Sequence, residues 1–405
     1  MSPPPPSAAS NRLVGLDILR IVAVFLVLGR HFPEPYPTTD HWIGWFFHQW
    51  RECGWAGVDQ FFVLSGFLVG GLLIQERQKY GGIRLARFLI RRGFKIYPAF
   101  YVMVAVTLLF QRQFDLSRLL SELLFVQNYF PGLWTHTWSL AVEEHFYLLL
   151  SVALTGLAIR QFVPWALAVC AVLPIWRLVH SWQHPVYLPM THLFPTHLRL
   201  DSLLWGVLLA VWYYQERTHF VQFWTRFRVP ALLAGSGAFV ALCGLPAGEP
   251  TVLSAHFVHT IGLTLLAWAS AALVSVSITR PWRDTRLLRL IQRVGQNSYS
   301  IYLWHMLIFQ ALFVTHVPTK IVAALHLPAT ILQSTWAREW NCVIFILASI
   351  LWGIATAKLI EFPVLHLRDR LFPSRLNRPA EAQQTPSVPP PPNYVAVSNS
   401  SFGSG

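Results

Sequence analysis

Charged residues are scarce in this chain: only 12% of its 405 residues are Asp, Glu, Lys or Arg, while 54% are hydrophobic. Soluble globular domains average about 25% charged residues, so this composition excludes an ordinary soluble fold. The chain also has only four cysteines, which show neither metal-ligand spacing nor a paired motif. Cysteine therefore gives no indication of zinc binding or redox chemistry, and we expect no metal.

Long apolar runs take the place of the missing charge. Several reach the ~20 residues that a helix needs to cross a bilayer, and they are more numerous than one signal peptide would explain. We predict an all-α polytopic membrane protein, a bundle of about ten transmembrane helices. The expected spans lie near residues 13–30, 55–74, 94–110, 138–158, 163–179, 200–214, 230–244, 257–278, 297–315 and 341–361.

Acidic residues are few as well, 18 against 31 Lys and Arg, which gives a net charge of +13. Such a charge is compatible with nucleic-acid binding, but in a polytopic membrane protein basic residues gather in cytoplasmic loops. Most of the basic residues here fall in alternate connections, including the segment from Gln75 to Lys95. This distribution predicts that both termini are cytoplasmic, and that the partner is a lipid bilayer and not nucleic acid.

The two ends of the chain differ in composition from the rest. Residues 1–11 form a Pro/Ser stretch without the basic-then-apolar pattern of a cleavable signal, and residues 371–405 are rich in Pro, Ser, Asn and Gln. Such compositions cannot bury a core, so we expect a disordered N-terminal segment and a disordered cytoplasmic tail. The transmembrane domain is expected to occupy residues 12–370.

Ionisable residues inside the apolar runs are candidates for function, because each costs several kcal/mol unless it faces a cavity or a partner. Arg20 and His31 are eleven residues apart, which on a helix is about three turns and roughly 16 Å on nearly the same face. The alternative for Arg20 is a structural pair with Asp17, three residues before it. The alternative for His31 is an interfacial histidine.

Three carboxylates are candidates to support an imidazole, because a nearby carboxylate orients the ring and stabilises its protonated form. These are Asp59, Glu143 and Glu144. Glu143 and Glu144 are adjacent and point about 100° apart on a helix, so we expect one to face a cavity and the other to pair elsewhere. In the same region as Asp59, Gly66 and Gly70 indicate close helix packing.

Seven motifs occur in order along most of the chain, and together they resemble the integral-membrane acyltransferase family 3. This family O-acylates sugars, cell-envelope polysaccharides and some antibiotics. The motifs are RLVGLDILR with His31 completing an Arg-x10-His pattern, GVDQFFVLSGFL, RFLIRRGFKIYP, HTWSLAVEEHFYLL, RLDSLLWG, GQNSYSIYLWH, and EFP at Glu361 to Pro363.

The resemblance implies transfer of an acyl group, usually acetyl, from cytoplasmic acyl-CoA to a hydroxyl of a sugar or cell-envelope glycan. The family's functional Arg and His fall on Arg20 and His31, with Arg20 near the acyl donor and His31 as base or acyl carrier. A bacterial cytoplasmic membrane is the expected location. Acyl-CoA is then a co-substrate, and the cavity lies within the bundle.

The basic stretch RRGFKIYP matches the family's cytoplasmic segment, with Lys95 where arginine is common. Arg91 and Arg92 are candidates to bind the phosphates of CoA bidentately, while Lys95 supplies a point charge. The alternative is that all three are ordinary positive-inside anchors. His305, in the middle of its helix, is expected to be a buried histidine hydrogen-bonded to a neighbouring helix, and Glu361 is expected to be structural.

Two other functions compete with an acyltransferase. A transporter or flippase also lines a helical cavity with polar residues, although no inverted pair of broken helices is visible in the sequence. An inactive sensor or scaffold on the same fold is the third possibility. Acyl transfer by the purified protein distinguishes the enzyme from both.

Overall fold

The computed structural model describes residues 14–33, 42–110, 114–243, 257–324, 326, 328, 336–374 and 376. Within these residues the regular structure is entirely helical, as predicted. The N-terminal segment 1–11 and most of the tail 371–405 lie outside the described residues, so their predicted disorder stays a prediction.

Each of the ten predicted spans contains a helix among the described residues. Five of these helical segments are long and apolar enough to cross a membrane by themselves: Ala56–Tyr80, Leu85–Phe110, Ile159–Gln183, Val258–Thr279 and Ala337–Leu371. The helices at the ten positions are α1 (Val14–Arg30), α3 (Ala56–Tyr80), α4 (Leu85–Phe110), α6 (Trp138–Gly156), α7 (Ile159–Gln183), α9 (Leu200–Gln215), α11 (Arg228–Cys243), η3 with α13 (Val258–Gly262 and Leu263–Thr279), α15 with η4 (Ser298–Phe309 and Gln310–Val314), and α17 with η6 (Ala337–Thr356 and Ala357–Glu361).

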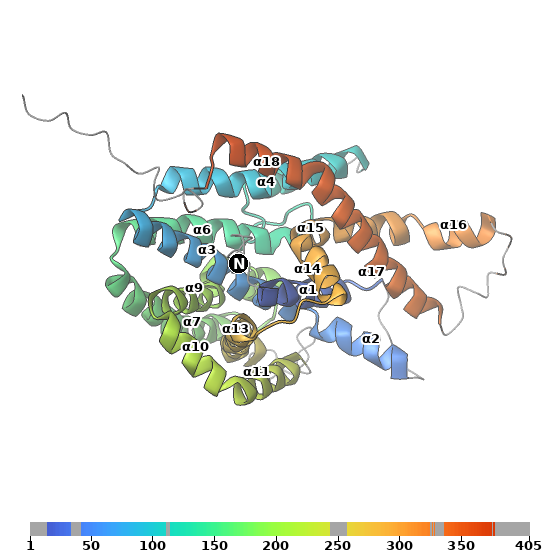
Figure 1. Ribbon diagram of the computed structural model, residues 1–405. Helices are drawn as coiled ribbons and strands as arrows, with labels where there is room; N and C mark the ends of the chain where they lie inside the picture. Colours follow the sequence, from blue (N-terminus) through green and yellow to red (C-terminus); the bar gives the residue numbers. More distant parts are fainter. Residues whose placement is uncertain are drawn as a thin grey trace, which may run out of the picture.

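Shorter helices connect or extend the spans. Their bounds are α2 (Trp42–Cys53), α5 (Leu116–Leu123), η1 (Thr135–Thr137), α8 (Pro189–His192), η2 (Thr196–Leu198), α10 (Arg217–Arg226), α14 (Arg286–Gln296), α16 (Val317–Ala324) and α18 (Phe362–Leu371). Two of them matter for the site: α18 lies beside α4, and η1 leads directly into α6 (Figure 1).

The outer helices present apolar side chains and the interior holds polar ones, which is the arrangement expected in a bilayer. On α7, Ile175 is 63% exposed and Trp182 is 85% exposed, and on α17 Leu351 is 68% exposed. Asp17 and Asp201, in contrast, are fully buried inside the bundle. The orientation of the two termini relative to the membrane stays a prediction.

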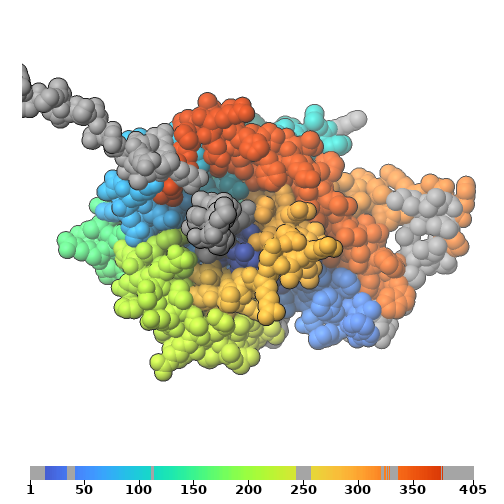
Figure 2. Space-filling model, viewed as in Figure 1, coloured from blue at the N-terminus to red at the C-terminus, as the bar shows by residue number. Residues whose placement is uncertain are grey.

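Helix α1 lies in the middle of the bundle and is surrounded by α2, α3, α13, α14 and α15 (Figure 1). Part of α1 is visible beside α14 in Figure 2. Ala23, Val24 and Leu28 in the middle and second half of α1 are fully buried among these helices.

Glycines allow α3 and α9 to pack backbone against backbone, as the Gly66 and Gly70 spacing predicted. A Cβ on Gly66 would lie 1.9 Å from the Leu203 carbonyl oxygen, and one on Gly206 would lie 2.2 Å from the Val63 oxygen. Both distances are far inside van der Waals contact, so only glycine fits. This close crossing fixes the start of α3, where Asp59 lies, against α9.

Candidate functional site

Two cavities lie beside α1. The larger, the histidine cavity, has a volume of about 390 Å³, and its polar lining includes His31, Asp59, His136 and Arg199. The smaller, the cationic cavity, has a volume of about 200 Å³, and its polar lining includes Arg20, Ser65, Arg92, Lys95 and Glu143. Val58 and Tyr302 line both cavities, so these two side chains lie between them.

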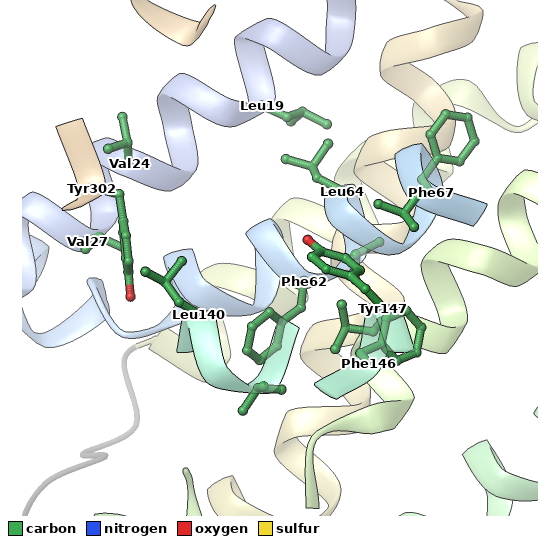
Figure 3. Close-up of a cluster of buried hydrophobic side chains, with 14 of the residues drawn as sticks. Leu19, Val24, Val27, Phe62, Leu64, Phe67, Leu140, Phe146, Tyr147 and Tyr302 are labelled. Carbon is green, nitrogen blue, oxygen red and sulfur yellow. The ribbon is translucent and has the colours of Figure 1, made fainter. Parts of the chain in front are cut away.

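Tyr302 is held firmly in this partition. Its hydroxyl donates to the His136 carbonyl oxygen at 2.6 Å and lies 2.5 Å from Ser139 Oγ. Figure 3 shows the ring beside Val27 of α1 and Leu140 of α6. The partition therefore joins α15 to α6.

His31 follows directly after the last residue of α1 and is partly buried. Its Nδ1 lies 3.0 Å from the Val27 carbonyl oxygen and 3.2 Å from His305 Nε2. Its Nε2 has no hydrogen-bond partner within the described residues, and it is not enclosed. The atom available to a substrate in the histidine cavity is therefore Nε2.

His305 and His136 complete a cluster of three imidazoles. His305 is fully buried, and its ring centroid lies 4.9 Å from those of both His31 and His136. The predicted burial of His305 is confirmed, and its hydrogen-bond partner outside its own helix is His31, the residue directly after α1. Sequence reasoning missed that this partner is His31, and it gave His136 no role. The only sequence signal for His136 and His305 is that each falls within one of the quoted motifs.

Asp59 pairs with arginine and not with an imidazole. Its Oδ1 accepts hydrogen bonds from Arg199 Nη2 at 2.7 Å and from Ser202 Oγ at 3.1 Å. Both charged side chains are only 1% exposed, and both line the histidine cavity. Asp59 is therefore in the cavity of His31, but its negative charge compensates Arg199.

The predicted pair of Arg20 with Asp17 is confirmed, with Nη1 2.6 Å from Oδ1. Asp17 is fully buried, whereas Arg20 is 25% exposed and lines the cationic cavity. Arg20 and His31 therefore face two different cavities, one toward each end of α1.

Glu143 and Glu144 separate as their spacing predicted. Glu143 lines the cationic cavity and accepts a hydrogen bond from Tyr147, and its Oε2 lies 3.9 Å from Arg92 Nη2. Glu144 accepts a hydrogen bond from Tyr97 at 2.9 Å. The carboxylate that faces a cavity thus lies with the arginines, on the other side of Tyr302 from the histidine cavity.

Each of the three predicted phosphate-binding residues has a carboxylate neighbour. Arg91 Nη2 lies 3.0 Å from Asp369 of α18, Arg92 contacts Glu143, and Lys95 Nζ lies 2.9 Å from Glu361. The same three residues also line a third cavity of about 170 Å³, together with Arg87 and Arg368. Arg92 and Lys95 are shared with the cationic cavity, so the two cavities adjoin.

The fold and the cavities define an integral-membrane helical protein with an internal site of histidines and arginines. Residues 13–358 match the family model of the acyltransferase domain called acyltransferase 3. The chain belongs to this family of membrane acyltransferases.

The relatives that the chain resembles are bacterial O-acetyltransferases. It is 25% identical over 382 residues to the peptidoglycan O-acetyltransferase OatA of Listeria monocytogenes, covering 86% of this chain and 55% of the relative. It is 28% identical over 327 residues to a putative O-acetyltransferase of Staphylococcus aureus strain COL, covering 72% of this chain and 50% of the relative. The chain thus spans about half the length of these relatives. No solved structure matches it.

Proposed function

We propose that this chain transfers an acetyl group from acetyl-CoA to a hydroxyl of a cell-envelope glycan. The observation that carries the proposal is the placement of two cavities along α1. A cationic cavity with Arg20 and a histidine cavity with His31 meet at Val58 and Tyr302. A long, thin donor held by its phosphates among cations can extend toward Tyr302, while a hydroxyl acceptor approaches from the other side.

His31 acts on the acceptor hydroxyl through Nε2. As general base, it takes the hydroxyl proton while the oxygen attacks the thioester carbonyl carbon. The carbon–sulfur bond then breaks, CoA leaves as thiolate, and that thiolate takes the proton from His31. The alternative role for His31 is acyl carrier, in which Nε2 attacks the thioester first and then passes the acyl group to the hydroxyl.

The cations act on the acyl donor. Arg91 and Arg92 bind the phosphates of CoA with their planar guanidinium groups, Lys95 adds a positive charge, and Arg20 lies nearer the thioester. Glu143 holds Arg92 in the cavity, and Glu144 fixes Tyr97. On the acceptor side, Asp59 holds Arg199 in the lining of the histidine cavity.

The orientation follows from the chemistry of the substrates. Acyl-CoA is made in the cytoplasm, so the cationic cavity opens toward the cytoplasm of a bacterial cell and the histidine cavity faces outward. The segment from Gln75 to Lys95 and both termini are then cytoplasmic, in agreement with the positive-inside rule. The acceptor class comes from the name of the Listeria relative, which acts on peptidoglycan.

The test is acetyl transfer by the purified chain in nanodiscs. Radiolabelled acetyl-CoA and soluble peptidoglycan muropeptides are supplied, and both CoA thiol release and alkali-labile label on the muropeptides are measured. An O-acetyltransferase gives both products in equal amounts. A transporter or a scaffold releases no thiol, and that result would overturn the proposal. Thiol release without labelled muropeptide would leave the donor correct and the acceptor wrong.

A further inference from the structure

His305 is the only side chain that hydrogen-bonds to His31 within the described residues, and it is fully buried. The contact joins residues that are 274 positions apart, from the end of α1 to the middle of α15. His305 belongs neither to the proposed base nor to the donor-binding residues. Its place next to His31 therefore calls for a separate explanation.

The hydrogen-bond partners determine which nitrogen of each ring carries the proton. His305 Nδ1 faces the Tyr302 carbonyl oxygen, which can only accept, so Nδ1 is protonated. In the neutral ring, Nε2 of His305 is then an acceptor. The 3.2 Å contact with His31 Nδ1 needs one donor, and His31 Nδ1 supplies it. The carbonyl oxygen of Val27, 3.0 Å from the same nitrogen, shares that proton with His305 Nε2 in a bifurcated hydrogen bond.

We infer that His305 is a positioning residue that holds His31 with its proton on Nδ1, so that Nε2 presents a lone pair to the histidine cavity. The inference deepens the proposed function and rests on it for the catalytic consequence. In serine hydrolases a carboxylate holds the catalytic imidazole in this way. Within the described residues no carboxylate bonds to His31, and Asp59 in the same cavity is committed to Arg199.

His305 also changes what happens when His31 takes up a proton. Protonation at Nε2 makes His31 an imidazolium, whose Nδ1 proton is still donated to His305 Nε2, and this charge-assisted bond is stronger than the neutral one. The proton leaves again from Nε2 to the CoA thiolate, so the pair returns to its starting state. Within the described residues His136 makes no hydrogen bond to His31 or His305: its Nε2 lies 3.2 Å from the Leu303 carbonyl oxygen, and its Nδ1 has no hydrogen-bond partner.

Two variants separate positioning from mere packing. In His305→Gln, the side-chain oxygen can occupy the place of the ring Nε2 and still accept from His31. In His305→Leu, the volume is largely kept but the acceptor is lost. The matched control is His192→Leu, which removes another buried histidine whose Nε2 lies near the His184 carbonyl oxygen and whose ring does not line the cavity.

The first measurement is solid-state NMR of nitrogen-15 histidine-labelled protein in bilayers at neutral pH, with the His31 signals assigned by their loss in His31→Ala. We expect Nδ1 of His31 to be protonated and Nε2 unprotonated. In His305→Leu only the Val27 carbonyl oxygen still accepts from Nδ1, so we expect a fraction protonated on Nε2 that the wild type lacks. A wild-type His31 protonated on Nε2 would overturn the inference. This measurement needs no turnover, so it stands apart from the success of the proposed function.

The second measurement is acetyl transfer from acetyl-CoA to muropeptides. We expect kcat to fall about 100-fold in His305→Leu with an unchanged KM for acetyl-CoA, and to stay within about tenfold of wild type in His305→Gln. The His192→Leu control keeps its activity. An inserted His305→Leu protein with wild-type kcat contradicts the inference but leaves the proposed function intact, whereas an inactive wild-type protein contradicts the proposed function.

Discussion

The cationic cavity and the histidine cavity lie toward opposite ends of one helix, and they differ in the polar groups that surround them. In the cationic cavity each basic side chain has a carboxylate close by, as in the pairs of Arg20 with Asp17 and Lys95 with Glu361. At the histidine cavity, His31 and His136 of the lining and His305 behind them contact carbonyl oxygens and one another, and the lining holds one buried pair, Arg199 with Asp59. The cationic cavity suits an anionic donor, whose phosphates replace the carboxylates as partners of the basic side chains. The histidine cavity suits an uncharged hydroxyl.

The largest effect is expected from the histidine cavity. His31→Ala removes the imidazole whose Nε2 is available in the histidine cavity, and a lost general base costs ~10²- to 10⁴-fold in rate. We expect transfer to muropeptides to fall by this factor while binding of acetyl-CoA is kept, because the phosphates bind in the other cavity. Transfer is measured by label incorporation and binding by calorimetry. A correctly inserted variant with near-normal transfer would contradict the division between the cavities.

The second effect concerns the ion pair of Asp59 with Arg199 in the histidine cavity. Asp59→Leu leaves the buried Arg199 without its compensating charge, and breaking a buried pair in this way costs about 3–5 kcal/mol. The double variant Asp59→Leu with Arg199→Leu removes both charges, so we expect it to recover most of the stability. Unfolding in detergent is followed by tryptophan fluorescence.

The exposed pair of Arg289 with Asp284 provides the control for this comparison. Asp284→Leu should change the free energy of unfolding by less than about 1 kcal/mol, since surface pairs contribute little. If Asp59→Leu is as mild as this control, the pair in the histidine cavity is not needed for folding.

The third effect tests the loop that supports the histidine cavity. Glu122 of α5 is buried and accepts from the backbone N–H of Leu133 at 3.0 Å, just before η1 and His136. Burial raises the pKa of Glu122 from 4.5 to about 7. The folded protein therefore holds this proton more tightly than the unfolded chain, and the stabilisation is complete below pH 4.5 and lost as pH rises to about 7.

The difference between the pKa of Glu122 in the folded protein and its ordinary value lowers the free energy of unfolding by up to about 3 kcal/mol as pH rises across that range. Glu122→Gln mimics the protonated side chain, so we expect it to remove this part of the pH dependence. Glu216→Gln, at a position with a 63% exposed side chain, is the control that leaves it unchanged. Equal pH profiles for wild type and Glu122→Gln would show that Glu122 does not titrate in this range.

The sequence predicted which segments are helical because apolar runs and their lengths are local properties. It also predicted local relations along one helix, such as the pair of Arg20 with Asp17 and the divergence of Glu143 from Glu144. It did not predict which helices are neighbours, because periodicity defines a face and not the element that covers it. The bond between His31 and His305 and the place of Glu143 among the arginines depend on such neighbours.

The smallest effect sharpens the comparison from the cationic side, where two roles for the basic residues remain. If Arg91 and Arg92 bind the phosphates of CoA, the double change Arg91→Gln with Arg92→Gln should weaken acetyl-CoA binding about 10- to 100-fold. This factor follows from about 1.5–3 kcal/mol for hydrogen bonds to charged groups.

The control is Arg286→Gln with Arg289→Gln on α14, a basic helix that contributes neither residue to the cationic cavity. Because Arg91 and Arg92 must release Asp369 and Glu143 before they bind a phosphate, the net loss should lie near the lower end of the range. Calorimetry with CoA measures it, and equal affinities for the two double variants would return Arg91 and Arg92 to the role of membrane anchors.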